Sequence, residues 1–294
     1  MELFCFVILH YKDLEVTDRC VRSILAMENQ EQIRIVVVDN DIKEKASKRA
    51  VLQKRYEAVP NIYVIQIKEN GGFSHANNAG YLFAKQELRA SYILALNNDI
   101  EFTQKDFTQR LQNAYQTNPC HILGPDIIRC GGGEHQNPLD TRLRTKKEAE
   151  YTIRMNRFAL RCYPLFYPLL YLQNRRVEKM RLRQNQANHA FYESVQKDIV
   201  PFGACLIYTP DFVHQEDRAF EPETQFYYEE YILTLRCRKK NYRIVYDPSL
   251  RVMHESGKAT KSSFGNEWKR LRFVMERTAE ACGIYLDYYK SKKM

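Results

Sequence analysis

Residues 91–102, SYILALNNDIEF, contain an apolar run that ends in the polar triplet Asn97-Asn98-Asp99. Such a run is typical of a buried strand, so the triplet is expected where the strand reaches the surface. A carboxylate there can bind a hard cation such as Mg²⁺ or Mn²⁺, which prefers oxygen ligands and keeps positions open for phosphate oxygens. The alternative is a simple turn, because Asn and Asp hydrogen-bond to their own backbone at strand ends. The choice depends on the neighbouring segments.

These segments alternate between two hydrophobic patterns. Short apolar runs occupy residues 3–9, 33–38, 62–67 and 92–96, and amphipathic stretches of helical length lie near residues 16–28, 43–57 and 75–89. Farther on, residues 198–213 have the pattern of a strand, a turn and a strand that returns to the sheet. Strands that alternate with helices predict an α/β fold with a mixed, mostly parallel central sheet flanked by helices.

Ligands of such a sheet bind at the carboxyl ends of its strands. Four polar clusters follow the four apolar runs, namely His10-Tyr11, Asp39-Asn40-Asp41, Asn70-Gly71-Gly72-Phe73 and Asn97-Asn98-Asp99. We therefore expect all four clusters at one edge of the sheet.

Two of these clusters have features of a nucleotide site. The carboxylate of Asp39 can accept a hydrogen bond from the N3–H of uracil or thymine, or from a ribose hydroxyl; the alternative is a helix cap or a turn. In ENGGFSHANNAG, residues 69–80, two glycines allow close approach of the backbone to a ligand, and the following helix would point its amides at phosphate. Asn77 and Asn78 add neutral hydrogen-bonding groups. The segment has neither the GxGxxG nor the GxxxxGK[ST] signature.

The second half of the chain adds two acids and a histidine. Glu229 and Glu230 begin a predicted helix, where one of them can take a proton from an attacking hydroxyl, or both can merely complement the helix dipole. Arg236, in the same helix, is expected to keep Glu230 ionised. His254 ends the segment LRVMH and is either a packed histidine or a ligand.

The net charge of +9 is concentrated in one segment. Between Arg142 and Arg183, twelve Lys or Arg residues stand against three Glu, which accounts for the whole +9. This predicted helical insertion, residues 134–197, suits an anionic membrane surface, with its aromatic residues in the interface. A helical lid or a contact between copies of the chain in a homo-oligomer suits it equally. The aromatic candidates are Tyr151, Phe158, Tyr163, Phe166, Tyr167 and Tyr171.

Other functional classes fit the composition less well. Nucleic-acid binding is disfavoured, because the chain outside residues 142–183 is neutral and carries no known nucleic-acid motif. The eight cysteines have neither a CxxC pair nor zinc-type spacing, which indicates reduced thiols of a cytosolic protein. The N-terminal LFCFVIL lacks the features of a secretory signal. We expect a cytoplasmic location, with peripheral attachment to the inner face of the plasma membrane as one form of it.

Six motifs in their order resemble family 2 glycosyltransferases with a GT-A fold, particularly the bacterial rhamnosyltransferase-like branch. The motifs are VVVDN, ENGGFSHANNAG, LALNND, VPFGACLIYTPDF, YYEEYILTLRCRKKNYRI and VMHESG. The resemblance covers about residues 3–130 and 198–260. It divides a single domain, residues 1–294, into a nucleotide-sugar-binding half (1–130), the basic helical insertion (134–197), an acceptor and catalytic half (198–260) and a C-terminal helix (264–294).

The resemblance implies roles for matching residues. Asp99 would be the metal-binding acid, with His254 completing the site for Mg²⁺ or Mn²⁺. Glu230 would be the base that deprotonates the acceptor, and Glu229 is the alternative. Residues expected beside the donor are His10, Asp39, Asn70, Gly72, Phe73, Asn78 and Asn98.

The implied activity is an inverting, metal-dependent transfer of a sugar from a UDP- or dTDP-sugar to a hydroxyl of a glycan or lipid-linked oligosaccharide, in the assembly of a cell-surface or capsular polysaccharide. Asn97 replaces the first acid of the fuller metal motif, Glu230 replaces the usual Asp, and Ile232 stands where a third acid is common. The missing acids keep a catalytically silent, membrane-associated scaffold as an alternative. A nucleotidyltransferase is a second alternative, disfavoured because the chain lacks the N-terminal Gly-rich, Arg-containing loop that holds a triphosphate.

Overall fold

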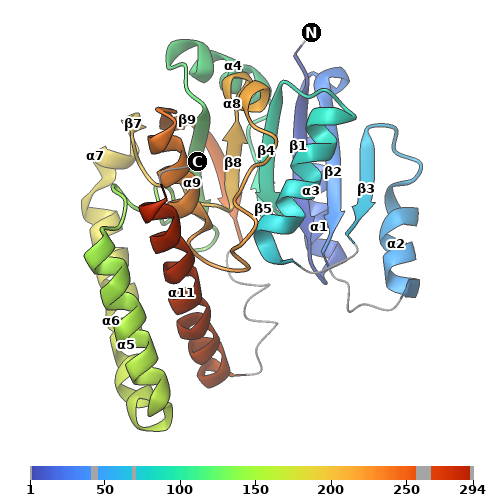
Figure 1. The fold of residues 1–294 in the computed structure, drawn as a ribbon. Coiled ribbons are helices and arrows are strands. Elements are labelled where there is room, and N and C mark those ends of the chain that lie inside the picture. Colours follow the sequence, from blue (N-terminus) through green and yellow to red (C-terminus); the bar gives the residue numbers. More distant parts are fainter. Residues whose placement is uncertain (1, 41–45, 68–70, 256–265, 292–294) are drawn as a thin grey trace.

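The computed structural model describes residues 2–40, 46–67, 71–255 and 266–291, and it has helices on both faces of a central sheet (Figure 1). Within these residues, nine strands form one sheet in the order β3-β2-β1-β4-β8-β6-β9-β5, with β7 paired to β9. The strands are β1 (Phe4–His10), β2 (Ile33–Asp39), β3 (Ile62–Gln66), β4 (Tyr92–Asn97), β5 (Ile100–Phe102), β6 (Ile122–Arg129), β7 (Gln196–Lys197), β8 (Cys205–Tyr208) and β9 (Ile244–His254).

The sheet is mixed and mostly parallel, as the sequence predicts. Strands β1 to β4 run in one direction. Strand β8 is antiparallel to both β4 and β6, so β6 runs with β4, and β9 is parallel to β6. The reversed strands in the described part of the chain are therefore β5, β7 and β8.

Helices cover the sheet and extend beyond it. They are α1 (Leu14–Leu25), α2 (Ala46–Tyr56), α3 (Gly72–Gln86), α4 (Phe107–Thr117), α5 (Lys146–Arg161), α6 (Tyr163–Ala187), α7 (His189–Tyr192), α8 (Pro210–Gln215), α9 (Glu229–Lys239) and α11 (Glu267–Lys290), with a short 3₁₀ turn at Gln30–Gln32. No helix within these described ranges combines the length and the apolar character that crossing a bilayer requires.

Strand β1 shows why polar and apolar residues do not alternate in the apolar runs. Phe4, Phe6 and Ile8 lie in one core cluster together with residues of α1, whereas Cys5 and Val7 lie in a second cluster with residues of α3. Successive side chains of a strand point to opposite faces, so a strand covered on both faces is apolar at every position.

The basic insertion is helical, as expected. Thr145 and Glu148 form a capping box that starts α5. Helices α5 and α6 form a hairpin, residues 146–187, whose turn lies at the end far from the sheet, and α11 runs beside it (Figure 1). The hydroxyl of Tyr163 donates to the backbone carbonyl of Trp268 at 2.9 Å, which ties α6 to α11.

Residues 198–213 have less strand structure than their pattern indicates. Val200 makes an isolated bridge with Asp140, and β8 follows after a turn. Pro210 then begins the short helix α8, because the fixed φ of proline suits the first turn of a helix.

Candidate functional site

The strand register brings the predicted polar clusters to one edge of the sheet. His10 is paired with Asp39 across β1 and β2, and Leu9 is paired with Asn97 across β1 and β4. The side chains of His10 and Asp39 are buried. Asn70, which was expected beside them, lies outside the described residues.

Thr17, which the sequence patterns did not single out, links two of these clusters. Its hydroxyl lies 3.1 Å from the carbonyl oxygen of Asp13, to which it donates, and it accepts from Nδ2 of Asn98 at 3.0 Å. Nδ1 of His10, at 2.7 Å, is then the second donor to the Thr17 oxygen. A threonine among the apolar residues of the buried face of α1 is the signal that could have identified Thr17.

Asp99 and His254 meet where β5 pairs with β9. The antiparallel register places Ile100 opposite His254, and the N–H of Glu255 donates to the carbonyl of Asp99 at 3.0 Å. Nε2 of His254 consequently lies 3.1 Å from Oδ1 of Asp99, and both side chains are nearly buried.

The surroundings of His254 fit a cation at this pair. Its Nδ1 lies 2.7 Å from Oε1 of Gln136, an oxygen that can only accept, so Nδ1 carries the ring proton. In the neutral ring the lone pair of Nε2 then faces the Asp99 carboxylate, and two electron-rich atoms this close need a proton or a metal ion between them. Adjacent ligands of an octahedral ion with bonds of about 2.1 Å lie about 3.0 Å apart, close to the observed separation.

This pair alone does not complete a metal site. Across residues 2–40, 46–67, 71–255 and 266–291, no three His, Cys, Asp or Glu side chains are grouped in a way that could hold an ion. One carboxylate oxygen and one imidazole nitrogen suit Mg²⁺ or Mn²⁺ when phosphate oxygens supply further ligands.

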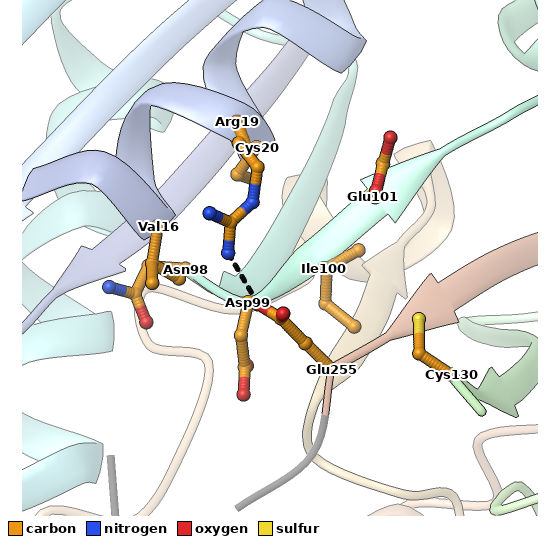
Figure 2. Close-up of a pocket in the computed structure, with 9 residues that line it drawn as sticks. All are labelled: Val16, Arg19, Cys20, Asn98, Asp99, Ile100, Glu101, Cys130 and Glu255. Atoms are coloured by element: carbon orange, nitrogen blue, oxygen red, sulfur yellow. Dashed lines mark hydrogen bonds and ion pairs between the residues drawn. The ribbon is translucent and has the colours of Figure 1, made fainter. Parts of the chain in front are cut away.

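A cavity of about 90 Å³ is lined by Asp99 and by the first turns of α1 (Figure 2). Arg19 of α1 forms an ion pair with Glu255. Figure 2 shows the Asp99 carboxylate pointing away from the Arg19 guanidinium. Arg19 thus pairs with Glu255, and the Asp99 carboxylate pairs with His254.

The glycine loop contacts the segment that precedes α9. Gly72 has a φ of +85°, and a Cβ there would lie 2.6 Å from the Cα of Gln225. The N–H of Phe73 donates to the Gln225 carbonyl at 3.1 Å. Asn78 donates through Nδ2 to the Phe220 carbonyl at 2.8 Å and accepts through Oδ1 from the Phe220 N–H at 2.9 Å. Helix α3 therefore holds the chain that leads to Glu229 and Glu230.

Glu230 lies close to the end of β4. Its Oε1 accepts the N–H of Gly203 at 3.1 Å. The next residue, Ala204, accepts the N–H of Asn97 with its carbonyl at 3.0 Å. The backbone of Gly203 and Ala204 therefore links the Glu230 carboxylate to the polar triplet that begins at Asn97.

Burial changes the acidity of both glutamates. Desolvation and the charge of Glu230 raise the pKa of Glu229 from 4.5 to about 8. Desolvation also raises the pKa of Glu230, and hydrogen bonds from the backbone N–H groups of Glu230 and Gly203 lower it by less. The expectation that Arg236 keeps Glu230 ionised is wrong, because the buried Arg236 guanidinium donates to Oε1 of Glu221 at 2.9 Å. Six helical positions place Arg236 on a different side of α9 from Glu230.

The comparison with protein families agrees with this arrangement. The sequence matches the model of glycosyl transferase family 2 over residues 5–179, which is more than half of the chain. The chain belongs to glycosyl transferase family 2. No curated protein matches this glycosyltransferase.

Solved structures show the fold of this glycosyltransferase. The crystal structure of TarS 1–349 from S. aureus aligns with a TM-score of 0.52 at 13% identity, over 99% of this chain and 72% of that one. TarS in complex with UDP-GlcNAc aligns with a TM-score of 0.53 at 13% identity, over 98% and 72%. The mannosyltransferase PcManGT from Pyrobaculum calidifontis, in complex with GDP-Man and Mn²⁺, gives 0.51 at 8% identity, over 99% and 76%. The fold is of the GT-A type, as predicted.

Proposed function

We propose that this glycosyltransferase moves a sugar from a nucleoside diphosphate sugar to an acceptor hydroxyl, with inversion at the anomeric carbon. The observation that carries the proposal is the 3.1 Å pair of Asp99 and His254 at the edge where Asp39 and Glu230 also lie. Such a transfer requires ligands for a cation, a buried acid that recognises the nucleobase, and a general base for the acceptor hydroxyl.

The donor would lie along the carboxyl ends of β1, β2 and β4. Asp39 suits the N3–H of uracil or thymine, which favours a UDP- or dTDP-sugar, and His10 with Asn98 lines the same edge. The complexes of TarS with UDP-GlcNAc and of PcManGT with GDP-Man support a nucleotide-sugar donor for this fold. Gly72, Phe73 and Asn78 would act on the donor by positioning α3 and the segment docked on it.

Asp99 and His254 would hold Mg²⁺ or Mn²⁺, in keeping with the Mn²⁺ bound by PcManGT. The bound ion would neutralise charge on the diphosphate leaving group. Gln136 fixes the His254 ring with Nε2 toward Asp99, so the protein presents its nitrogen ligand before the ion arrives.

Glu230 is our candidate for the base. Its carboxylate would take the proton of the acceptor hydroxyl as that oxygen bonds to the anomeric carbon and the bond to the diphosphate breaks. Glu230 is connected through Gly203 and Ala204 to the β4 end, and these contacts support it over Glu229. The acceptor that we propose is a glycan or lipid-linked oligosaccharide at the inner face of the plasma membrane, in cell-surface or capsular polysaccharide assembly.

Nucleoside diphosphate release tests this proposal. Purified protein with Mn²⁺ would be incubated with UDP-, dTDP- and GDP-sugars, with and without lipid-linked oligosaccharide. We expect release with one nucleotide class and an increase on adding acceptor. Release of pyrophosphate from a nucleoside triphosphate and a sugar phosphate would indicate a nucleotidyltransferase. Neither release nor donor binding across the panel would support a catalytically silent scaffold.

A further inference from the structure

The outer surface of the α5–α6 hairpin carries large apolar side chains in water. Leu165, Leu169 and Leu172 are 82%, 62% and 54% exposed, and their spacing places them on one face of α6. Phe158, at the end of α5, is 56% exposed. These four residues, here called the outer patch, surround the hairpin turn. Large apolar side chains exposed near one another at the end of a helical hairpin indicate an interaction site.

The opposite surface of the hairpin is packed, which makes the outer patch a rigid one. Tyr163 is buried, and its ring and that of Tyr167 contact Trp268 of α11, with centroids 4.7 Å and 4.5 Å away. Phe166 also packs against this cluster. The suggestion that Tyr163 anchors in a membrane is therefore wrong, because its ring is buried. Phe166 and Tyr167 are partly buried by the same packing, and the exposed outward positions are leucines.

The hairpin is also the most basic part of the molecule. Exposed basic side chains flank the outer patch on both helices, namely Arg154, Arg157, Arg161, Arg175, Arg176, Lys179 and Arg183. Residues 172–180 are all exposed, so every face of this stretch of α6 is accessible to solvent. A basic surface with exposed leucines complements anionic headgroups over an apolar layer.

The direction of the hairpin relates this surface to the candidate site. Strand β1 runs from the end marked N toward the opposite end of the sheet, and the hairpin extends beyond the sheet in that same direction (Figure 1). Helix α5, with 16 residues, is about 24 Å long. A flat surface that touches the hairpin turn would therefore face the strand ends that hold His10 and Asp39.

We propose that the outer patch docks on an anionic membrane and holds the candidate site toward the bilayer. Leucines at the turn enter the interface, and the flanking arginines contact headgroup phosphates. This deepens the proposed function, because a lipid-linked acceptor would then present its glycan to Glu230 from the membrane side. The proposed membrane contact is argued from the hairpin surface alone, whereas the proposed lipid-linked acceptor depends on the proposed sugar transfer.

A second copy of the chain fits this surface less well. Two copies of the outer patch would bring together two clusters of positive charge with few acids to balance them, since residues 142–183 contain three Glu for twelve Lys or Arg. Anionic lipid removes that repulsion.

Vesicle cosedimentation of the full chain tests the membrane contact. We expect binding to phosphatidylglycerol-containing vesicles, little binding to pure phosphatidylcholine vesicles, and release at high salt. Arg175→Gln with Arg176→Gln should weaken partition about fivefold per charge, or roughly 30-fold for the pair. Leu165→Ser with Leu169→Ser should weaken it on the order of tenfold or more.

Matched controls lie on α2 and α4, outside the α5–α6 hairpin. Val51→Ser, at an exposed apolar position of α2, and Lys54→Gln with Arg110→Gln should leave vesicle binding unchanged. Equal binding of the hairpin variants and the unaltered protein would overturn the proposal. Vesicle binding that persists while Leu165→Ser with Leu169→Ser converts a dimer to a monomer would assign the patch to a second copy. Nucleoside diphosphate release with a soluble acceptor, measured on the same variants, separates loss of membrane contact from loss of transfer.

Discussion

At the scale of single residues, the orientation of His254 governs the candidate metal site. Nδ1 of His254 donates to the Gln136 oxygen, so Nε2 is the ring nitrogen that faces the Asp99 carboxylate. The proposed cation would lie between these two atoms, with the ring held in place by Gln136.

Binding of Mn²⁺ in the presence of UDP tests that arrangement by a readout independent of turnover. Asp99→Ala should abolish it, because the anionic ligand is lost. Gln136→Leu should weaken it by roughly 10- to 100-fold, because the His254 ring loses the contact that orients it. Electron paramagnetic resonance of free Mn²⁺ gives the affinity. Glu101→Gln, an exposed acid two positions away, is the control, and equal affinity in all variants would contradict the assignment.

The Glu230 carboxylate has a second residue-scale constraint in Gly203. A Cβ at Gly203 would lie 2.6 Å from Oε1 of Glu230, so Gly203→Ala keeps the N–H and displaces the carboxylate. We expect Gly203→Ala and Glu230→Gln to retain donor binding and to lower turnover, by roughly 10²-fold or more for Glu230→Gln. Calorimetry with donor and the initial rate of release separate the two effects. If Glu229→Gln lost turnover while Glu230→Gln kept it, the base would be Glu229.

Glu229 should make stability depend on pH. Its pKa rises from 4.5 unfolded to about 8 folded, so the folded state binds the proton more tightly. The stabilisation is complete below the unfolded pKa and is lost as the pH rises toward the folded one. At about pH 8, Glu229→Gln should therefore raise the free energy of unfolding by on the order of 1 kcal/mol or more, and the melting temperature with it. At about pH 4, both quantities should change little.

Thermal unfolding at both pH values provides that measurement. Glu57→Gln, an exposed carboxylate, is the control and should show no such pH-dependent gain. A gain of equal size at both pH values would contradict a buried, neutral Glu229.

At the scale of elements, helix α3 and the segment before α9 act as one unit. Asn78 engages both backbone groups of Phe220, and Ser74 and Thr224 hydroxyls lie 3.0 Å apart. The donor-side loop and the approach to Glu230 are therefore joined across more than one hundred residues of chain.

Removing this connection should cost stability before it affects chemistry. Asn78→Ala breaks two hydrogen bonds and leaves the buried Phe220 N–H and carbonyl without that partner, which should lower the free energy of unfolding by about 2 kcal/mol. Chemical denaturation measures the change. Gln86→Ala, an exposed position at the end of the same helix, should be nearly neutral. A neutral Asn78→Ala would show that the segment is held by its other contacts.

At the scale of the whole molecule, the sheet could be predicted and several partnerships could not. Apolar runs bounded by polar residues identify β1 to β4, and parallel strands necessarily bring His10, Asp39 and Asp99 to one edge. Hydrophobic periodicity, however, predicts which face of a helix or strand is buried, and it does not predict which distant residue a side chain will contact. Arg236 was expected at Glu230 and pairs with Glu221. Tyr163 was a candidate for a membrane anchor, with a lid or a contact between copies as the alternative, and it packs on α11. Both outcomes depend on how elements dock, which local patterns do not encode.

The backbone bond between Asn97 and Ala204 bears on how this glycosyltransferase can be redesigned. It joins the end of β4, which leads to Asp99, to the residue before β8, and no exchange of side chains removes it. Side-chain substitutions in either strand therefore leave this backbone bond in place, so the distance between Asn97 and Ala204 is set by the fold and not by individual side chains.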